Sequence, residues 1–173
     1  MGRKEMSTCP VCDTHLIEQS GSTDSEILIV GNYPTDKEIE RLKPQDRHDL
    51  EPFIGWGGKY FRQELAKAGL DYYQCRAVTL WRHKQNKNAE CLEFMMEQII
   101  KEAKDKKLIL LCGSEIVTTF LDYKVSDTCG LWMDCTYFSG KVMPMYNPSQ
   151  MLHGGLGEIR LCLKKFILEV EKL

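Results

Sequence analysis

The chain has no long apolar run, and no stretch approaches the roughly 20 apolar residues that a membrane-spanning helix needs. No apolar core follows the first residues, MGRKEMSTCPVC, so we expect no secretory leader. The sequence contains neither a Gly-x-Gly-x-x-Gly motif nor a P-loop, which argues against the common nucleotide-binding folds. It also has no internal repeat and no low-complexity segment. We therefore predict one domain over residues 1–173, with a cysteine-containing metal-binding segment at 1–25.

The chain carries little net charge. Its formal charge is −2 at pH 7, so bulk charge does not identify a nucleic-acid-binding protein. Hydrophobic residues make up 43% and charged residues 28%, which is typical of a globular domain. The 8 cysteines are many, but without a secretory leader we do not expect them to form a disulfide framework.

Short apolar runs alternate with helical patterns along the chain. The expected strands are residues 26–30, 75–81, 107–113 and 141–146, with a further short strand near 135–138. The expected helices are residues 58–69, 88–104, 114–121 and 157–173, the third with Ser114 as its N-cap. The segments 31–57, 125–140 and 147–156 are expected to be irregular, and 19–25 to be a flexible connector. This alternation predicts an α/β fold of three αβα layers around a central four-stranded, mostly parallel sheet.

Ligands of such sheets bind beyond the carboxyl ends of the strands. The first expected strand is followed by Gly31-Asn32-Tyr33-Pro34, and the last by Asn147-Pro148-Ser149. Between them lies Pro52-Phe53-Ile54-Gly55. The sequence therefore places three polar, proline-containing segments where a ligand would bind.

These three motifs, in this order and through essentially the whole chain, resemble the uracil-DNA glycosylase superfamily. The resemblance is nearest to its iron–sulfur-containing family four and implies a divergent member. It implies a DNA glycosylase that flips uracil or a related modified pyrimidine out of single- or double-stranded DNA and hydrolyses its N-glycosidic bond. We expect a cytoplasmic monomer. A nucleoid-associated location, a viral origin and membership of a larger DNA-processing assembly stay open.

The resemblance assigns roles to individual residues. Asn32 would position the attacking water, and Asn147 would stabilise the departing base anion, as an oxyanion hole does. Phe53 would stack on the flipped base, and Met151 or Leu152 would fill the vacated stack as an apolar wedge. The substrate-binding set that the resemblance implies is Gly31, Tyr33, Pro34, Phe53, Ala77 and Ser149.

The sequence departs from family four at several of these positions. Asn32 replaces a glutamate, and a neutral amide can orient water but cannot accept its proton. Asn147 replaces a histidine, as in the mismatch-specific branch of the superfamily. Ala77 stands where an asparagine usually contacts the base edge, and Thr79 is the alternative. A second hypothesis is therefore a catalytically degenerate glycosylase fold that binds DNA or recruits other proteins, and Tyr33 or Trp56 filling the pocket would favour it.

Family four binds a cubane iron–sulfur cluster through four cysteine thiolates. Cys9 and Cys12 match the first pair and Cys91 the last, whereas the third position falls on Trp81, two residues before His83. The predicted metal ligands are Cys9, Cys12, His83 and Cys91. A zinc site is one interpretation, since three cysteines and one histidine are a common structural zinc set. A 4Fe-4S cluster with one histidine ligand and a site without metal are the alternatives.

Overall fold

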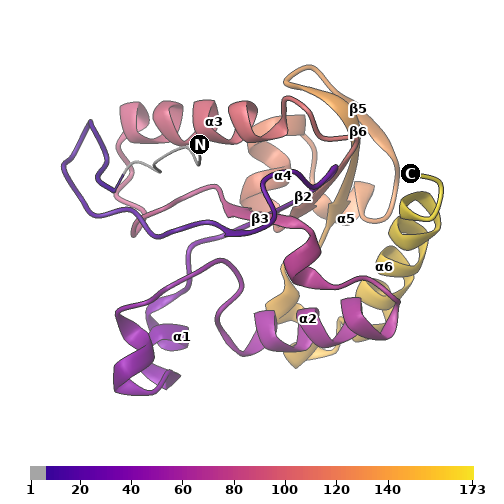
Figure 1. Cartoon of the computed structure of the whole chain (residues 1–173), viewed down its shortest axis with the longest axis horizontal. Helices are drawn as coiled ribbons and strands as arrows, with labels where there is room; N and C mark the ends of the chain where they lie inside the picture. The colour runs from indigo at the N-terminus through magenta and orange to yellow at the C-terminus, as the bar shows by residue number, and fades with distance from the viewer. Residues whose placement is uncertain (1–6) are drawn as a thin grey trace.

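A computed structural model describes residues 7–173, so the first six residues of the predicted domain and of its N-terminal segment lie outside the described part. A six-stranded sheet in the order β1-β3-β2-β4-β6-β5 forms its centre (Figure 1). The strands are β1 Ser20–Gly21, β2 Ile27–Gly31, β3 Arg76–Thr79, β4 Leu108–Cys112, β5 Met133–Cys135 and β6 Phe138–Met145. The inner strands β3, β2, β4 and β6 are parallel, as predicted, and β1 and β5 add antiparallel edges.

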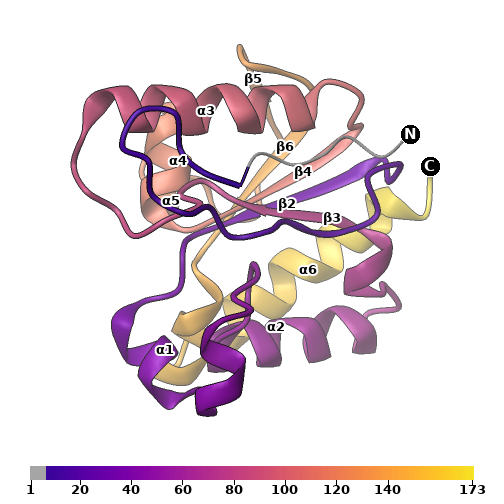
Figure 2. The same cartoon turned by 60° about the vertical axis from the view of Figure 1, so that its left-hand side comes forward.

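Helices cover both faces of this sheet. They are α1 Asp36–Arg41, α2 Trp56–Lys67, α3 Ala89–Ala103, α4 Ser114–Leu121, α5 Val125–Thr128 and α6 Leu156–Val170, with 3-10 turns η1 Pro44–Arg47, η2 Tyr72–Gln74 and η3 Pro148–His153. Figure 2 shows α3 and α4 on one side of the sheet and α2 and α6 on the other, which confirms the three-layer prediction. No helix in residues 7–173 is both long enough and apolar enough to cross a bilayer.

The apolar runs form the inner strands because both faces of the sheet are covered. Every residue of β2 and β4 is buried, as expected for parallel strands between two helical layers. Side chains alternate between the layers, so Leu28 and Val30 pack on the α3 side and Ile29 packs on the α2 and α6 side. The core therefore has two halves, one on each face of the sheet.

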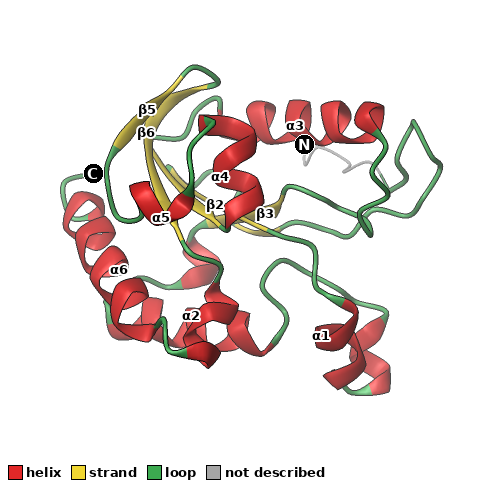
Figure 3. Cartoon of the chain, turned by 180° about the vertical axis from the view of Figure 1, so that it is seen from behind, coloured by secondary structure: helices red, strands yellow, loops and turns green. Residues whose placement is uncertain are grey.

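Several segments expected to be irregular contain regular structure. Residues 31–57 include α1, which begins with a capping box in which Thr35 and Glu38 bind each other's backbone N–H. The expected irregular region 125–140 contains α5 and the turn of the β5–β6 hairpin, seen from behind in Figure 3. The N-cap of α4 is Gly113 rather than Ser114, because the chain leaves β4 with a φ of 123° that only glycine adopts readily.

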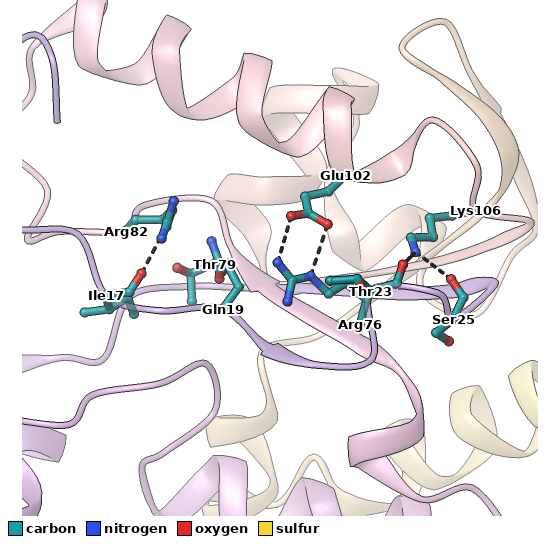
Figure 4. Close-up of polar contacts among 9 residues, drawn as sticks. All are labelled: Ile17, Gln19, Thr23, Ser25, Arg76, Thr79, Arg82, Glu102 and Lys106. Carbon is teal, nitrogen blue, oxygen red and sulfur yellow. Dashed lines mark hydrogen bonds and ion pairs between the residues drawn. The ribbon is translucent and has the colours of Figure 1, made fainter. Parts of the chain in front are cut away.

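The segment 19–25, expected to be a flexible connector, is part of an N-terminal strap that covers the outer edge of β3 (Figure 4). Arg82 Nε donates to the carbonyl oxygen of Ile17 at 3.0 Å. Lys106 Nζ donates to the carbonyl oxygens of Thr23 and Ser25 at 2.7 and 2.6 Å. Both cationic side chains are buried, so the strap supplies the hydrogen-bond acceptors that they need. The strap also covers the edge of β3.

An ion-pair cluster joins α2 to α6 on the opposite side of the molecule. The buried Glu64 carboxylate accepts hydrogen bonds from Arg160 Nε at 2.7 Å and from Lys67 Nζ at 2.8 Å. These bonds, first from Arg160 and then from Lys67, lower the pKa of Glu64 to about 2 from its usual 4.5. The charged carboxylate therefore stabilises the contact between the two helices.

Replacing Glu64 with Gln should remove this contribution. Because the pKa of Glu64 is lowered in the folded state, its stabilisation is present above about pH 4.5 and is lost as the pH falls towards 2. We expect E64Q to unfold at lower urea than the wild type at pH 7, and the two curves to converge between about pH 5 and pH 2. Glu97→Gln, at an exposed position of α3, is the control and should show little change. A difference in urea unfolding between E64Q and the wild type that does not change with pH would contradict this assignment.

Candidate functional site

A cleft of about 830 Å³ opens at the carboxyl ends of the parallel strands. The chain adds β3 on one side of β2 and then crosses to add β4 on the other side, so the strand order reverses at the boundary of β2 and β4. Such switch points are where α/β sheets bind ligands. Loops that follow β2, β3, β4 and β6 all contribute to the cleft, as does the start of α2. The predicted site residues that line it are Asn32, Tyr33, Pro34, Phe53, Asn147, Ser149 and Leu152.

Two side-chain amides converge at the base of this cleft, over Gly113. The Nδ2 atoms of Asn32 and Asn147 lie 3.2 and 3.7 Å from the position that a Cβ of Gly113 would occupy. These residues follow β2, β6 and β4, so the parallel pairing of the strands brings them together. A glycine at position 113 leaves room for both amides at one point of the site.

The two amides differ in how their carbonyl oxygens are satisfied. Asn147 Oδ1 accepts a hydrogen bond from the Ser149 N–H at 2.9 Å, which caps η3 and leaves the Nδ2 hydrogens as donors. Asn32 Oδ1 is buried and has no hydrogen-bond partner among the described residues. An unpaired buried acceptor is costly, and in native structures it commonly marks the place of a ligand or water. The two amides therefore bring Nδ2 donors together over Gly113, and Asn32 adds one buried, unpaired acceptor.

Phe53 forms the aromatic wall of the cleft in a strained backbone conformation. Its φ is 60°, which is unusual for a bulky residue and points to a functional constraint. Its ring lies directly on Gly31, where a Cβ would be only 2.5 Å from the ring atom Cζ. A Cβ on Gly58 would lie 1.9 Å from the Phe53 carbonyl oxygen, so the first turn of α2 also requires glycine. Phe61 supports the ring from below, with centroids 5.0 Å apart.

Neither Tyr33 nor Trp56 fills the cleft, although both belong to its lining. Tyr33 packs partly against the core on the α3 side, and burial raises the pKa of its hydroxyl, so the group stays neutral. Trp56 begins α2 and is 53% exposed. Both side chains thus form part of the wall of a cleft that keeps a volume of about 830 Å³.

Three predicted site residues do not reach the cleft lining. Gly31 is buried beneath the Phe53 ring, so it shapes the site without facing it. Met151 packs against the core on the α2 and α6 side, which leaves Leu152, 41% exposed, as the candidate wedge. Ala77 is fully buried in the middle of β3, paired with Ile29, so the structure does not support the prediction that it contacts a base.

The cleft also contains polar residues that the motifs did not identify. Lys84 pairs with Asp36 across the cleft, with Nζ and Oδ2 2.7 Å apart. Glu115, in the first turn of α4, accepts hydrogen bonds from the Trp81 indole at 3.0 Å and the Gln85 amide at 2.8 Å. The sequence signal that could have identified these residues was their position, because each of them closely follows the end of a strand. His153, the last residue of η3, completes this set.

The four predicted metal ligands come together outside the cleft. The ligand atoms of Cys9, Cys12, His83 and Cys91 all lie within 4.8 Å of one another, and this group can hold a metal ion. The Sγ atoms of Cys9 and Cys91 are 4.0 Å apart, and Cys12 Sγ is 3.4 Å from His83 Nε2. The structure therefore joins a turn near the N-terminus to the loop that follows β3.

The surroundings of this group favour metal binding. His83 Nδ1–H donates to the Lys84 carbonyl oxygen at 2.8 Å, which directs the free Nε2 lone pair towards Cys12. Hydrogen bonds from Thr14 lower the pKa of the Cys12 thiol to about 6 and so favour the thiolate that a metal requires. Burial raises the pKa of Cys91 and opposes its thiolate, and the hydrogen bond that its sulfur accepts from Asn86 at 3.4 Å partly offsets this effect.

Comparison with protein families identifies the class of this chain. The model of the uracil DNA glycosylase superfamily matches residues 18–169, and the chain belongs to this superfamily. No individual curated protein matched the sequence. The matched region includes the three motifs and the cleft but begins after Cys9 and Cys12. The family match therefore supports the fold and the class of activity, and the nearness to family four stays a prediction.

Replacing Gly31 with Ala should disrupt the aromatic wall. The new Cβ would clash with the Phe53 ring, and overpacking of this kind typically costs about 1–3 kcal/mol. We expect a loss of that size in urea unfolding, together with weaker binding of DNA. Gly157→Ala is the matched control, because its Cβ in α6 would meet no atom within 4 Å. Equal stability of the two variants would show that the ring is not held against Gly31.

Proposed function

We propose that this chain is a DNA glycosylase that flips uracil or a related modified pyrimidine out of DNA and hydrolyses its N-glycosidic bond. The observation that carries the proposal is the meeting of the Asn32 and Asn147 amides over Gly113, beside an open aromatic wall. One amide supplies donors and the other an unpaired acceptor. Hydrolysis of a glycosidic bond needs both, because a base leaves as an anion and water must be oriented against the sugar.

The residues act on the two sides of the bond that breaks. The flipped base stacks on Phe53, and Leu152 enters the gap that the base leaves in the DNA. Asn147 Nδ2 donates to a carbonyl oxygen of the base and stabilises its negative charge as the bond to C1′ breaks. Asn32 Oδ1 accepts a hydrogen bond from the water that adds to C1′. The capping bond from Asn147 to the backbone keeps its donor in place before the substrate arrives.

We assign discrimination between bases to Thr79, the alternative to Ala77, although Thr79 is not itself among the residues that line the cleft. Its hydroxyl is fully buried at the end of β3, and its oxygen has no hydrogen-bond partner in the described chain. Thr79 pairs in register with Gly31, on which the Phe53 ring lies. A hydroxyl can donate or accept, so it suits uracil but does not by itself exclude other pyrimidines.

We assign contact with the DNA backbone to α1, which borders the cleft. Its exposed Lys37 and Arg41 make no ion pair in the part of the chain that the structure describes, and both line the cleft. Lys84 is partly neutralised by Asp36. With so few free cations, binding should depend only weakly on salt, because each phosphate contact contributes a slope of roughly −0.9 in log K against log salt for duplex DNA.

The test of the reaction uses two substitutions of Asn147. Asn147→Asp keeps an oxygen to cap η3 but loses the amide donor, whereas Asn147→Ala loses both. On uracil-containing single- and double-stranded oligonucleotides followed by alkaline cleavage, we expect wild-type protein to cut and both variants to be slower by roughly 100- to 1,000-fold. Only Asn147→Ala should also lose stability, by about 1 kcal/mol in urea unfolding. An uncut strand with stoichiometric wild-type protein would sink the proposal.

A DNA-binding module without catalysis is the second candidate. The observation that favours it is the neutral Asn32 in the first loop, because an amide cannot take a proton from water. The same experiment separates the candidates when DNA binding is measured alongside. Wild-type protein that binds the oligonucleotides and leaves every strand intact would support this alternative.

For the metal group we propose zinc. A tetrahedral zinc with bonds of about 2.0–2.3 Å places its ligand atoms roughly 3.5–4 Å apart. The spacings of 4.0 Å between Cys9 and Cys91 and 3.4 Å between Cys12 and His83 suit a single ion of this kind. Thiolates bound to separate irons of a cubane stand further apart, so a cluster suits this group less well. Zinc here would have a structural role, since four protein ligands leave no open position.

Elemental analysis and the visible spectrum test this assignment. We expect about one zinc per chain, no visible absorbance, and a lower melting temperature after chelation. Cys91→Ser should lose the zinc, and Cys135→Ser, at a half-buried thiol outside the group, should retain it. Iron with visible absorbance would support a cluster instead, and purified protein without metal would rule out both.

A further inference from the structure

We propose that Glu115 is the general base of this cleft, accepting a proton from the water that Asn32 orients. The inference rests on the proposed glycosylase function and deepens it. It supplies the proton acceptor that the first loop lacks. It assigns a role to a residue outside the three sequence motifs.

The chemistry of the attacking water requires a second acceptor. Water offers two hydrogens, and Asn32 Oδ1 can accept a hydrogen bond from one of them without ever taking the proton. As the oxygen bonds to C1′ it becomes positively charged and must lose a proton. A carboxylate within hydrogen-bonding reach can accept it, and general bases of this kind typically contribute about 100- to 10,000-fold in rate.

Three residues with carboxylates line the described part of the cleft, and two are already engaged. Asp36 forms an ion pair with Lys84 at 2.7 Å. Glu38 Oε2 accepts hydrogen bonds from the backbone N–H and the hydroxyl of Thr35, at 2.8 and 2.9 Å, in the capping box of α1. Its other oxygen, Oε1, lies against Gly55 at the start of α2, 2.5 Å from the position that a Cβ would occupy there. Glu115 is the carboxylate that remains.

Glu115 is oriented without being neutralised. Its Oε1 atom accepts from both Trp81 Nε1 at 3.0 Å and Gln85 Nε2 at 2.8 Å, and both donors are uncharged. Its Oε2 atom makes no hydrogen bond or ion pair in residues 7–173. One oxygen therefore fixes the side chain and the other is available to a substrate or a water.

The position of Glu115 also matches this role. It lies two residues after Gly113, the residue over which the Asn32 and Asn147 amides meet. The base, the water-orienting amide and the anion-stabilising amide thus follow β4, β2 and β6, which pair in that region of the sheet. Adjacent parallel strands place the three groups on the wall of one cleft.

The step balances without any further reactant. The water oxygen bonds to C1′ of the deoxyribose, and the bond between C1′ and the base nitrogen breaks. Its electron pair leaves with the base, and the Asn147 amide stabilises the resulting anion. One proton passes from the water to Glu115 Oε2 and then to solvent, and the released base anion takes a proton from solvent.

Glu115→Gln is the direct test, because the amide oxygen can still accept from Trp81 and Gln85 while its basicity is lost. On a uracil-containing oligonucleotide we expect the single-turnover rate to fall roughly 100-fold or more. DNA affinity and the urea unfolding curve should stay close to wild type. Glu97→Gln, at an exposed position of α3 outside the cleft, should leave the single-turnover rate near the wild-type value.

Chemical rescue distinguishes a proton acceptor from a structural residue. Added formate should restore part of the single-turnover rate of Glu115→Ala, and it should not restore the rate of Asn147→Ala. Active wild-type protein with an equally active E115Q would overturn this inference and leave the glycosylase proposal standing. Failure of formate to rescue an otherwise folded Glu115→Ala would also overturn it. If wild-type protein cuts no uracil-containing strand, the proposed function itself fails.

Discussion

The parallel pairing of β2 with β3 on one side and β4 on the other is the constraint on which the site depends. Because parallel strands end at the same edge, loops far apart in the sequence meet there. Asn32, Lys84 and Glu115 follow β2, β3 and β4, Asn147 follows the neighbouring parallel strand β6, and all four line one cleft. The two helical layers hold the strands in register by burying β2 and β4 completely. The chemistry of the site is thus assembled by sheet topology.

The loop that follows β3 links this cleft to the metal group. Residues 81–91 carry His83 and Cys91, and between them lie Lys84 and Gln85 of the cleft wall. The His83 ring is hydrogen-bonded to the backbone carbonyl of Lys84. The orientation of the imidazole is therefore coupled to the backbone position of Lys84 in the cleft wall. An ion bound there would limit the motion of a long loop that otherwise has little regular structure.

The layers and the four inner strands could be predicted because they depend on local patterns, since apolar runs mark buried strands. The cysteine group was predicted from the resemblance to family four, because only Cys9 and Cys12 are close in sequence. Ser20–Gly21 could not be predicted as a strand, since its pairing with β3 is tertiary. The capping box of Thr35 and Glu38 was a readable signal for α1. Ala77 was assigned from the resemblance, and the structure buries it in the middle of β3. Glu115 was missed because its partners are distant in sequence.

The glycines beneath and beside Phe53 have a consequence for how such a protein can diverge. Gly31, Gly58 and Gly113 fix the shape of the cleft because ring, backbone and amide atoms lie close against them. The polar side chains of the cleft are held by separate hydrogen bonds, such as those of Asn147 and Glu115. Shape and reactivity are therefore encoded at different positions. A lineage can exchange the amides and carboxylates of this fold, and with them its substrate, as long as its glycines are left untouched.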